Sequence, residues 1–180
     1  TKAEYPLRIE VKPRKTLSSR EKTGINSMCT AAYEEELGEL IESFCDAVHV
    51  LGFVDDHLVS HALWITRFLQ IGDKPFLQTA YVEAVATSKR HRNRGYASEV
   101  MKRLANEISH FDIAALSPFS DAYYERLGWE KWRGPLMERT KGGKISSPED
   151  EAVMILRLPR TPDIDLTSPI SIEWRPGEVW

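Results

Sequence analysis

The sequence predicts an α/β fold in which one mixed, mostly antiparallel sheet carries helices on both faces. Apolar runs of strand length recur along the chain, and segments with helical periodicity lie between them. No internal repeat or low-complexity segment interrupts this succession. With 180 residues, 42% of them hydrophobic, the chain can bury a substantial core, so we expect residues 1–180 to form a single domain.

The expected elements begin with a strand at residues 7–12, where apolar and polar side chains alternate. Ser18 or Ser19 is expected to cap the helix that follows. Glu21 favours Ser18, because the two residues have the spacing of a capping box. This helix is expected to end near the acidic residues 34–36.

The middle of the chain predicts a short helix and then the central strands of the sheet. The helix is expected around residues 37–44. Two strands, 48–54 and 58–69, flank Asp55-Asp56-His57, which is a turn sequence typical of hairpins. A longer strand is expected at 76–87.

The remaining segments continue the alternation of helices and strands. From Tyr96 onward the apolar residues recur at helical spacing, which predicts a packed helix. After it we expect a buried strand at 111–117, a short helix opened by Pro118 and ended by Gly128, a strand that begins at 129–132, a loop at 141–144, a strand at 152–158 and an extended segment at 170–174.

A basic loop, Arg90 to Ala97, joins the long strand to the helix that begins at Tyr96. The first N–H groups of a helix have no intrahelical partner, and the helix dipole favours an anion beside them. We therefore expect this loop to bind a phosphate or pyrophosphate, with Gly95 letting the backbone approach the ligand. The alternative is a solvated basic loop that only caps the helix.

Two motifs around this loop resemble the GCN5-related N-acetyltransferases (GNAT). Arg92-x-x-Gly95-x-Ala97 is similar to the R/Q-x-x-G-x-G/A loop that binds the pyrophosphate of acetyl-CoA in that superfamily. Tyr124 stands four residues before Gly128, where the superfamily has a tyrosine near the acetyl-CoA sulfur. The resemblance implies the GNAT fold, with the sheet split at the acetyl-CoA site, and an acetyl-CoA-dependent N-acetyltransferase.

Further segments resemble the aminoglycoside 2'-N-acetyltransferases over nearly the whole chain. They are the terminus Trp174-Arg175-Pro176-Gly177-Glu178-Val179-Trp180, which is the most distinctive, and the segments 81–86, 116–117, 128–135 and 147–150. The resemblance implies direct acetyl transfer to an amino group of an aminoglycoside in a ternary complex, antibiotic resistance, and a homodimer. The acceptor is left open between a deoxystreptamine drug and kasugamycin.

Carried over to this sequence, the resemblance implies three groups of site residues. The cofactor-binding group comprises Val85 and Thr87, through backbone contacts to the pantetheine arm, and Arg92, Asn93, Arg94, Gly95, Tyr96 and Ala97 at the pyrophosphate. The acceptor group comprises Glu36, where the match is loose, and Ser117, Asp150, Glu178 and Trp180. The catalytic group comprises Glu83, Tyr124 and Trp180.

The chemistry of acetyl transfer gives roles to the catalytic group. Glu83, a carboxylate in an apolar strand, is the candidate base acting through water. Its alternative role is that of a structural carboxylate paired to Arg67 or His61. Tyr124 is the candidate acid for the departing thiolate, or else a tyrosine that only packs in its helix. A backbone N–H near Val85 is expected to polarise the thioester carbonyl.

Three acidic clusters fit a polycationic acceptor. They are residues 34–36, residues 149–151, and Glu178 with the α-carboxylate of Trp180, whose reference pKa is about 3.5. Each cluster taken alone is also explained by solubility. A chain that ends in tryptophan is suited to docking of its terminus, because a large aromatic ring is costly to leave exposed.

Composition limits the other partners. The net charge of −3 makes the basic loop a local feature, which argues against nucleic acid as a partner. The five histidines and two cysteines show no metal-ligand spacing, so we expect acetyl-CoA as co-substrate and no metal. The absence of a disulfide framework, a long apolar run or a signal-peptide pattern favours a cytoplasmic protein that does not bind membranes.

Two alternative functions remain at this stage. A generic GNAT enzyme acting on a protein or polyamine amine would keep the loop and Tyr124 but would need no acidic pocket at the C-terminus. A non-catalytic acetyl-CoA-binding module would need neither Glu83 nor Tyr124.

Overall fold

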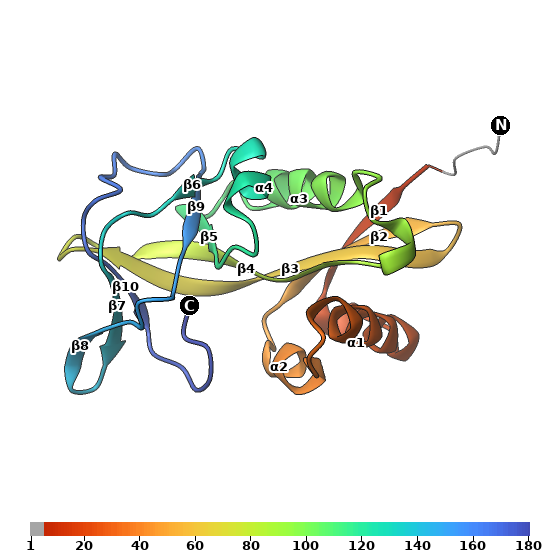
Figure 1. Cartoon of the computed structure of the whole chain (residues 1–180), viewed down its shortest axis with the longest axis horizontal. Helices are drawn as coiled ribbons and strands as arrows, with labels where there is room; N and C mark the ends of the chain where they lie inside the picture. The colour runs from red at the N-terminus through yellow and green to blue at the C-terminus, as the bar shows by residue number, and fades with distance from the viewer. Residues whose placement is uncertain (1–5) are drawn as a thin grey trace. The chain divides into compact units, whose positions relative to one another are not determined.

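The computed structural model describes residues 6–180 (Figure 1). The contacts within the chain divide it into two compact units. The first unit comprises the residues up to 65 together with 83–107, and the second comprises 66–82 and 108–180. Strands β3 (His57–Ile71) and β4 (Leu77–Thr87) run through both units. The single domain expected for residues 1–180 stays a prediction.

The sheet of the first unit is an antiparallel meander. It consists of β1 (Arg8–Pro13), β2 (Val48–Val54) and the first part of β3, followed by the last part of β4. The expected hairpin is present, and its turn residues Asp55 and Asp56 both have positive φ, at 48° and 60°. A turn of this conformation matches the right-handed twist of the flanking strands.

Helices cover both faces of this meander (Figure 1). On one face lie α1 (Ser19–Tyr33) and α2 (Gly38–Ser43), and on the other lies α3 (Tyr96–Glu107). Two short 3₁₀ turns, Arg14–Thr16 and Lys89–His91, precede α1 and α3. The predicted capping box is confirmed: the Ser18 hydroxyl accepts from the Glu21 amide, and the Glu21 carboxylate accepts from the Ser18 amide.

The second unit has the strand order β6-β9-β5-β4-β3-β10-β7-β8. Its further elements are β5 (Ile113–Leu116), α4 (Asp121–Arg126), β6 (Glu130–Lys131), β7 (Leu136–Thr140), β8 (Gly143–Ser146), β9 (Met154–Arg157) and β10 (Ile170–Glu173). The pairs β4/β5 and β10/β7 are parallel, and the other registered pairs are antiparallel. The predicted mixed, mostly antiparallel sheet with helices on both faces is confirmed.

Two local predictions in the second unit are wrong. Pro118 does not open α4; the helix begins at Asp121, and the Ser120 hydroxyl caps it by accepting from the Tyr123 amide at 3.3 Å. Serine is the better cap because its hydroxyl satisfies an amide that has no intrahelical partner. The loop expected at 141–144 is shorter, because Gly143 already begins β8 in a hairpin with β7.

Gly134 explains part of the tryptophan-rich segment 128–135. A Cβ atom at Gly134 would lie 1.9 Å from the carbonyl oxygen of Ser168, so only glycine fits there. The indole of Trp132 donates to the same carbonyl at 2.9 Å. This segment therefore fastens the long connection that leads to β10.

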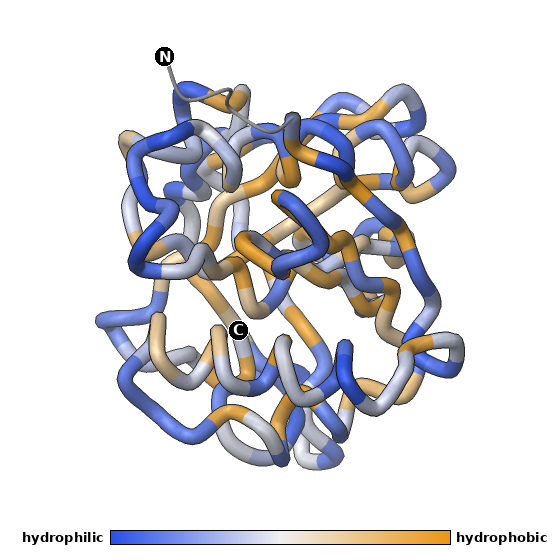
Figure 2. The backbone as a smooth tube through the Cα atoms, turned by 90° about the vertical axis from the view of Figure 1, so that its right-hand side faces the viewer, coloured by the Kyte–Doolittle hydropathy of each residue, from blue (hydrophilic) through white to orange (hydrophobic). Residues whose placement is uncertain are grey.

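The buried residues of each unit are mostly hydrophobic. Hydrophobic and hydrophilic residues alternate along the backbone, and many of the outer turns are hydrophilic (Figure 2). In the first unit the buried residues include Ile25, Val50, Leu51, Val100 and Leu104, and in the second Leu69, Ile113, Met154, Ile170 and Ile172. Among residues 6–180, no helix is both long enough and apolar enough to cross a membrane. Cys29 and Cys45 are free thiols.

Candidate functional site

The basic loop ends at an accessible helix N-terminus. Asn93 and Gly95 have φ of 61° and 80°, and the carbonyl of Gly95 accepts the first bond of α3, from the Glu99 amide at 3.1 Å. The amides of Tyr96 and Ala97 precede that bond and so have no intrahelical acceptor. A Cβ atom at Gly95 would meet nothing within 4 Å, so the surroundings of this residue are open. The loop therefore fits a pyrophosphate.

The charges around the loop favour an anion as well. Arg90, Arg92 and Arg94 are exposed. The pKa of His91 is lowered from its ordinary value, first by partial burial and then by the neighbouring Arg94 and Arg90. These guanidinium groups make the local potential positive, although the whole chain carries a net charge of −3.

The substitution Gly95→Asp is expected to weaken acetyl-CoA binding at least about tenfold, which corresponds to about 1.4 kcal/mol. It places a negative charge where the pyrophosphate is expected, and it puts a side chain on a residue with φ of 80°. Calorimetric titration with acetyl-CoA measures the effect, and circular dichroism checks that the variant is folded. Unchanged affinity in a folded variant would exclude this loop as the pyrophosphate site.

Strand β4 loses its partner β5 after Val82. Its parallel pairing with β5 ends at Val82 and Leu116, while β4 itself continues to Thr87. Ala84 has a φ of 54°, which is rare for a residue other than glycine inside a strand. A single left-handed residue is one conformation found in β-bulges, so we call this irregularity the β4 bulge. Glu83 is the residue immediately before this bulge, and it is half-buried.

Three successive carbonyl groups of the bulged segment accept bonds from side chains. The carbonyl of Ala84 accepts from His61 at 2.8 Å. That of Val85 accepts from the Tyr33 hydroxyl at 3.0 Å, and that of Ala86 from the Ser60 hydroxyl at 3.2 Å. The backbone near Glu83 is thus held by side chains in addition to the sheet.

The groups expected to bind pantetheine lie in this segment. The carbonyl of Val85 is engaged by Tyr33, and the hydroxyl of Thr87 lies 3.0 Å from that of Ser60. Their pairing with the pantetheine arm stays a prediction. Tyr33, at the C-terminal end of α1, is a neighbour of Val85 that the sequence motifs did not indicate.

The two suggested structural partners of Glu83 both have other contacts. His61 uses one ring nitrogen for the carbonyl of Ala84 and the other for His49. Arg67 binds Glu173 and the carbonyl of Val179. The role of Glu83 as base stays a prediction.

His49 and His61 form a buried pair beside the bulge. Nδ1 of His49 lies 2.8 Å from Nε2 of His61, and neither side chain is exposed to solvent. Cys29 Sγ lies 3.9 Å from Nδ1 of His61. Burial lowers the pKa of His49 to about 3 and that of His61 to about 4, and the positive charge of Arg14 adds to both effects. Both rings are therefore neutral at neutral pH.

This pair is expected to make the protein acid-sensitive. The pKa values of both histidines in the folded protein lie below the ordinary value of 6.5. Below that pH the unfolded chain therefore binds more protons than the folded protein, which favours unfolding. Stability is fully present above about pH 6.5 and falls as the pH drops toward 4. Two such histidines give a slope of up to about 2.7 kcal/mol per pH unit in the free energy of unfolding.

Urea denaturation at pH 7, 6 and 5 measures this slope. His49→Asn removes one of the two groups and is expected to halve the slope. An unfolding free energy that stays constant between pH 6.5 and 5 would contradict the prediction.

In the second unit, Tyr124 is buried in α4 with 1% of its surface exposed. Its ring makes edge contacts with Phe119, Tyr123 and Trp129, at centroid distances of 5.2, 5.1 and 6.1 Å. Its carbonyl accepts from the amides of Leu127 and Trp129. The surroundings fix the position of the ring, and the role of Tyr124 as acid stays a prediction.

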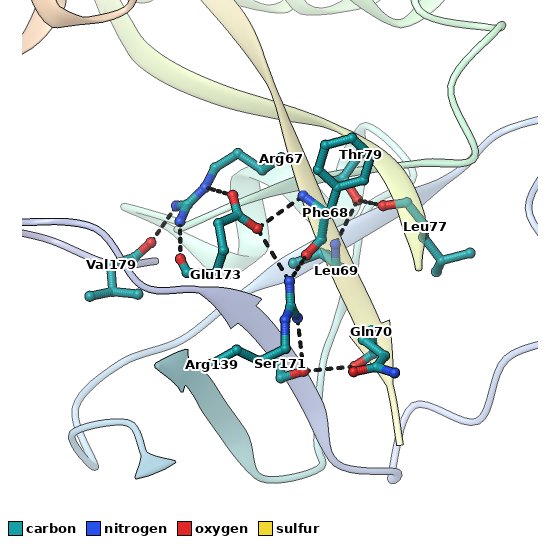
Figure 3. Close-up of polar contacts among 10 residues, drawn as sticks. All are labelled: Arg67, Phe68, Leu69, Gln70, Leu77, Thr79, Arg139, Ser171, Glu173 and Val179. Atoms are coloured by element: carbon teal, nitrogen blue, oxygen red, sulfur yellow. Dashed lines mark hydrogen bonds and ion pairs between the residues drawn. The ribbon is translucent and has the colours of Figure 1, made fainter. Parts of the chain in front are cut away.

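The C-terminal segment is held in the second unit by a buried arginine (Figure 3). Arg67, 3% exposed, donates to the carbonyl of Val179, to the Glu173 carboxylate at 2.7 Å and to the Glu173 carbonyl at 2.6 Å. Arg139 donates to the same carboxylate at 3.4 Å and to the Ser171 hydroxyl at 2.9 Å. The strand β10 and the terminus that follows it are therefore linked to β3.

Trp180 is docked as the sequence predicts. Only 2% of the residue is exposed, and its indole donates to the Ser147 hydroxyl at 2.7 Å. The carbonyl of the exposed Glu178 accepts from Arg175 at 2.6 Å. The last residue of the chain is thus fixed in position.

Carboxylates from three parts of the second unit act electrostatically on Glu151. The pKa of Glu151 is raised, first by its partial burial and then by the charges of Glu178, Asp150 and Glu138. We call these four residues the acidic group. Glu138, on β7 and 6% exposed, is a member that the sequence motifs did not indicate. The group has the charge that a polycation requires.

The remaining predicted acceptor residues have simpler surroundings. Ser117 follows β5 and is exposed. Glu36 is exposed in the first unit, and its carboxylate accepts from the Gly38 amide at 2.8 Å, at the start of α2. Their contacts with an acceptor stay predictions. The described part of the chain contains no group of three or more histidine, cysteine, aspartate or glutamate residues that could hold a metal ion.

A family model described as an acetyltransferase (GNAT) domain matches residues 15–132. The chain belongs to the GNAT acetyltransferases, a family of N-acetyltransferases that use acetyl-CoA as the acetyl donor.

Individual members of the family and solved structures resemble this chain over most or part of its length. An aminoglycoside 2'-N-acetyltransferase from Mycolicibacterium fortuitum is 31% identical over 176 residues, covering 91% of this chain and 87% of the relative. A GNAT family N-acetyltransferase (YhbS) from Escherichia coli, solved in complex with CoA, has a TM-score of 0.68 at 14% identity, covering 96% of this chain and 92% of its own. A probable N-acyltransferase from Enterococcus faecalis has a TM-score of 0.58 at 19% identity. It is larger: the match covers 69% of this chain and 32% of that one.

Proposed function

We propose that this enzyme transfers the acetyl group of acetyl-CoA to an amino group of an aminoglycoside antibiotic and so confers resistance. The observation that carries the proposal is the acidic group in the unit where the terminal Trp180 is docked. Aminoglycosides are polycations, and several carboxylates attract them more strongly than they attract a monoamine. The likeness to the aminoglycoside 2'-N-acetyltransferase from M. fortuitum supports the same substrate class.

The proposed reaction is a direct transfer. A water molecule bound to Glu83 takes a proton from the acceptor ammonium and passes it to the carboxylate, which leaves a neutral amine. The amine nitrogen attacks the thioester carbonyl, the new C–N bond forms and the C–S bond breaks. The thiolate of CoA leaves and takes the phenolic proton of Tyr124. This proton transfer must accompany cleavage of the C–S bond, because the reference pKa of tyrosine is about 10. The attacking nitrogen is positively charged once the C–N bond has formed, and it gives its second proton to the phenolate, which restores Tyr124.

The other assigned residues bind and orient the two reactants. Backbone groups of Val85 and Thr87 and amides from Arg92 to Ala97 hold acetyl-CoA, and a backbone N–H near Val85 stabilises the oxyanion. Glu36, Ser117, Asp150, Glu178 and the carboxylate of Trp180 bind the acceptor. Orientation of two bound reactants accounts for most of the acceleration, because no covalent enzyme intermediate is formed.

The alternative substrates are a protein amine or a polyamine, and a non-catalytic acetyl-CoA-binding module is the alternative without chemistry. A polyamine is also cationic, so it is the alternative substrate that the acidic group discriminates against least. It lacks the sugar hydroxyl groups of an aminoglycoside, so it offers no oxygen to which the exposed Ser117 hydroxyl could donate.

A panel of acceptors incubated with acetyl-CoA tests the proposal. The panel contains deoxystreptamine aminoglycosides, kasugamycin, spermidine and a lysine-rich peptide, and mass spectrometry detects a gain of one acetyl group. We expect acetylation of at least one aminoglycoside, with kcat/KM at least tenfold above spermidine. NMR of the product identifies the acetylated amine, which we expect at the 2' position. Acetylation of only spermidine or the peptide, or of nothing, would refute the proposal.

Two further parts of the proposal concern the protein in the cell. We expect a homodimer, which sedimentation equilibrium measures, and a cytoplasmic enzyme. Expression in a susceptible bacterium is expected to raise the inhibitory concentration of the acetylated drug, whereas the Tyr124→Phe variant is not.

A further inference from the structure

We propose that His61 and His49 are positioning residues of the acetyl-transfer site: together they hold the β4 bulge at Ala84, and so orient Glu83 and Val85 on either side of it. The roles of Glu83 and Val85 rest on the proposed function. The holding of the bulge rests on hydrogen bonds in the first unit alone.

The hydrogen bonds determine where each proton lies. The carbonyl of Ala84 can only accept, so Nδ1 of His61 carries a hydrogen and donates it. Nε2 of His61 then has a lone pair, and it accepts from Nδ1 of His49 at 2.8 Å. The chain of donors runs from His49 through His61 to the backbone of β4. Nε2 of His49 is left as a buried acceptor with no hydrogen-bond partner in the described chain.

The two hydrogen bonds end at the one residue of β4 whose backbone departs from the strand conformation, and this position gives the histidine pair its proposed function. Successive side chains of a regular strand point to opposite faces, and a bulge changes which way the residues beside it point. Ala84 has the positive φ of 54° that creates the bulge, and the Ala84 carbonyl is the group that His61 holds. Without that bond, the strand loses one restraint on an unfavourable conformation, and Glu83 and Val85 lose their fixed orientation.

The pair acts as a fixed support and does not exchange protons with solvent during turnover. Both rings are completely buried, and burial keeps them neutral above about pH 5. The sulfur of Cys29, a residue of α1, lies 3.9 Å from both His61 Nδ1 and the Ala84 carbonyl oxygen. Its thiol is also buried, which raises its pKa to about 12, so it is protonated as well. The donor and acceptor pattern is therefore constant over the working pH range.

Three variants separate a positioning role from a purely structural one. His61→Phe keeps an aromatic ring but removes both hydrogen bonds. His61→Asn retains an N–H donor near the position of Nδ1 and can still serve the Ala84 carbonyl. His49→Phe leaves the bond of His61 to Ala84 in place but removes the donor behind it. His110→Asn, at an exposed histidine of the second unit, is the matched control.

Kinetics with the best aminoglycoside of the panel provide the first readout, at a temperature where each variant is folded by near-ultraviolet circular dichroism. We expect His61→Phe to lower kcat at least tenfold and His49→Phe to lower it less. His61→Asn should recover kcat to within about threefold of the wild type. The Kd for CoA should change less than kcat does in every variant, because the loop at residues 92–97 is untouched and only the contacts of Val85 with the pantetheine arm are disturbed. A His61→Phe variant that is folded and has wild-type kcat would overturn the proposal.

Nitrogen NMR of the histidine rings provides a readout that needs no acceptor. We expect both His61 and His49 to be neutral and protonated at Nδ1 at pH 7, in the free protein and with CoA bound. The opposite tautomer of His61, or a charged ring, would overturn the proposal even if every variant were impaired. Should the wild type acetylate none of the panel, the proposed function fails, while these tautomers still decide whether the pair holds Ala84.

Discussion

Replacing Tyr124 with phenylalanine is expected to lower kcat by about 100- to 10,000-fold, the usual range of a general acid, and to leave the affinity for acetyl-CoA unchanged. The substitution removes the phenolic proton that the departing thiolate would take. It keeps the ring, and the contacts with Phe119, Tyr123 and Trp129 hold that ring in place. Steady-state kinetics measure kcat, and calorimetry measures the acetyl-CoA Kd.

Tyr123→Phe is the matched control, because Tyr123 is the next residue of the same helix and is only half-buried. It is expected to change kcat by less than threefold. An equally small effect of Tyr124→Phe would show that Tyr124 is a packing residue.

Elements whose signals are local could be predicted from the sequence. The capping box of Ser18 and Glu21, the hairpin at Asp55-Asp56, and the strand, loop and helix around Gly95 each depend on residues within a few positions of one another. The wrong start of α4 has a local cause as well. Pro118 suits the first position of a helix, but Ser120 offers the hydroxyl that caps it, so the helix begins later.

The sequence does not indicate the hairpin of β7 and β8, because these segments lack the hydrophobic alternation of a half-buried strand. All four residues of β8 are exposed, and only Glu138 is buried in β7. The pairing with β8 and β10 holds these polar segments in a sheet, and this pairing involves residues from distant parts of the chain. Periodicity carries no information about such contacts.

The bulge and the histidine pair are intermediate cases. Nothing local marks Ala84 for a positive φ, since glycine, asparagine and aspartate are the usual residues there. The hairpin register, however, pairs His49 with Leu63 and Leu51 with His61, so the two histidines are diagonal neighbours on one face. A correctly predicted hairpin therefore already places the two histidines beside each other. The bond of His61 to the carbonyl of Ala84 does not follow from the hairpin, because it depends on how β4 pairs with β3. The acidic group is similar, because Glu138 and Glu178 are far apart in sequence.

Converting the terminal carboxylate of Trp180 to an amide, together with Glu178→Gln, is expected to raise the KM for a polycationic aminoglycoside by about tenfold or more. Each change removes one negative charge, and charge-assisted hydrogen bonds contribute about 1.5–3 kcal/mol, less where solvent screens them as at Glu178. The Kd for acetyl-CoA should be unchanged. Ligation of a synthetic C-terminal peptide amide gives the protein, and kinetics at two salt concentrations measure the effect.

These two changes test the role of the terminal charges more directly than deletion of residues 178–180 does. Deletion would remove the Val179 carbonyl from the buried Arg67 and the indole of Trp180 from Ser147, so it would destabilise the second unit whatever the terminus does for the acceptor. The amide and Glu178→Gln keep both contacts. Asp163→Asn, at an exposed carboxylate of the same unit, is the charge control and should leave the acceptor KM unchanged. If the doubly altered protein acetylates aminoglycosides with wild-type KM at low salt, the terminus is only structural, and the case for a polycationic acceptor loses its main physical support.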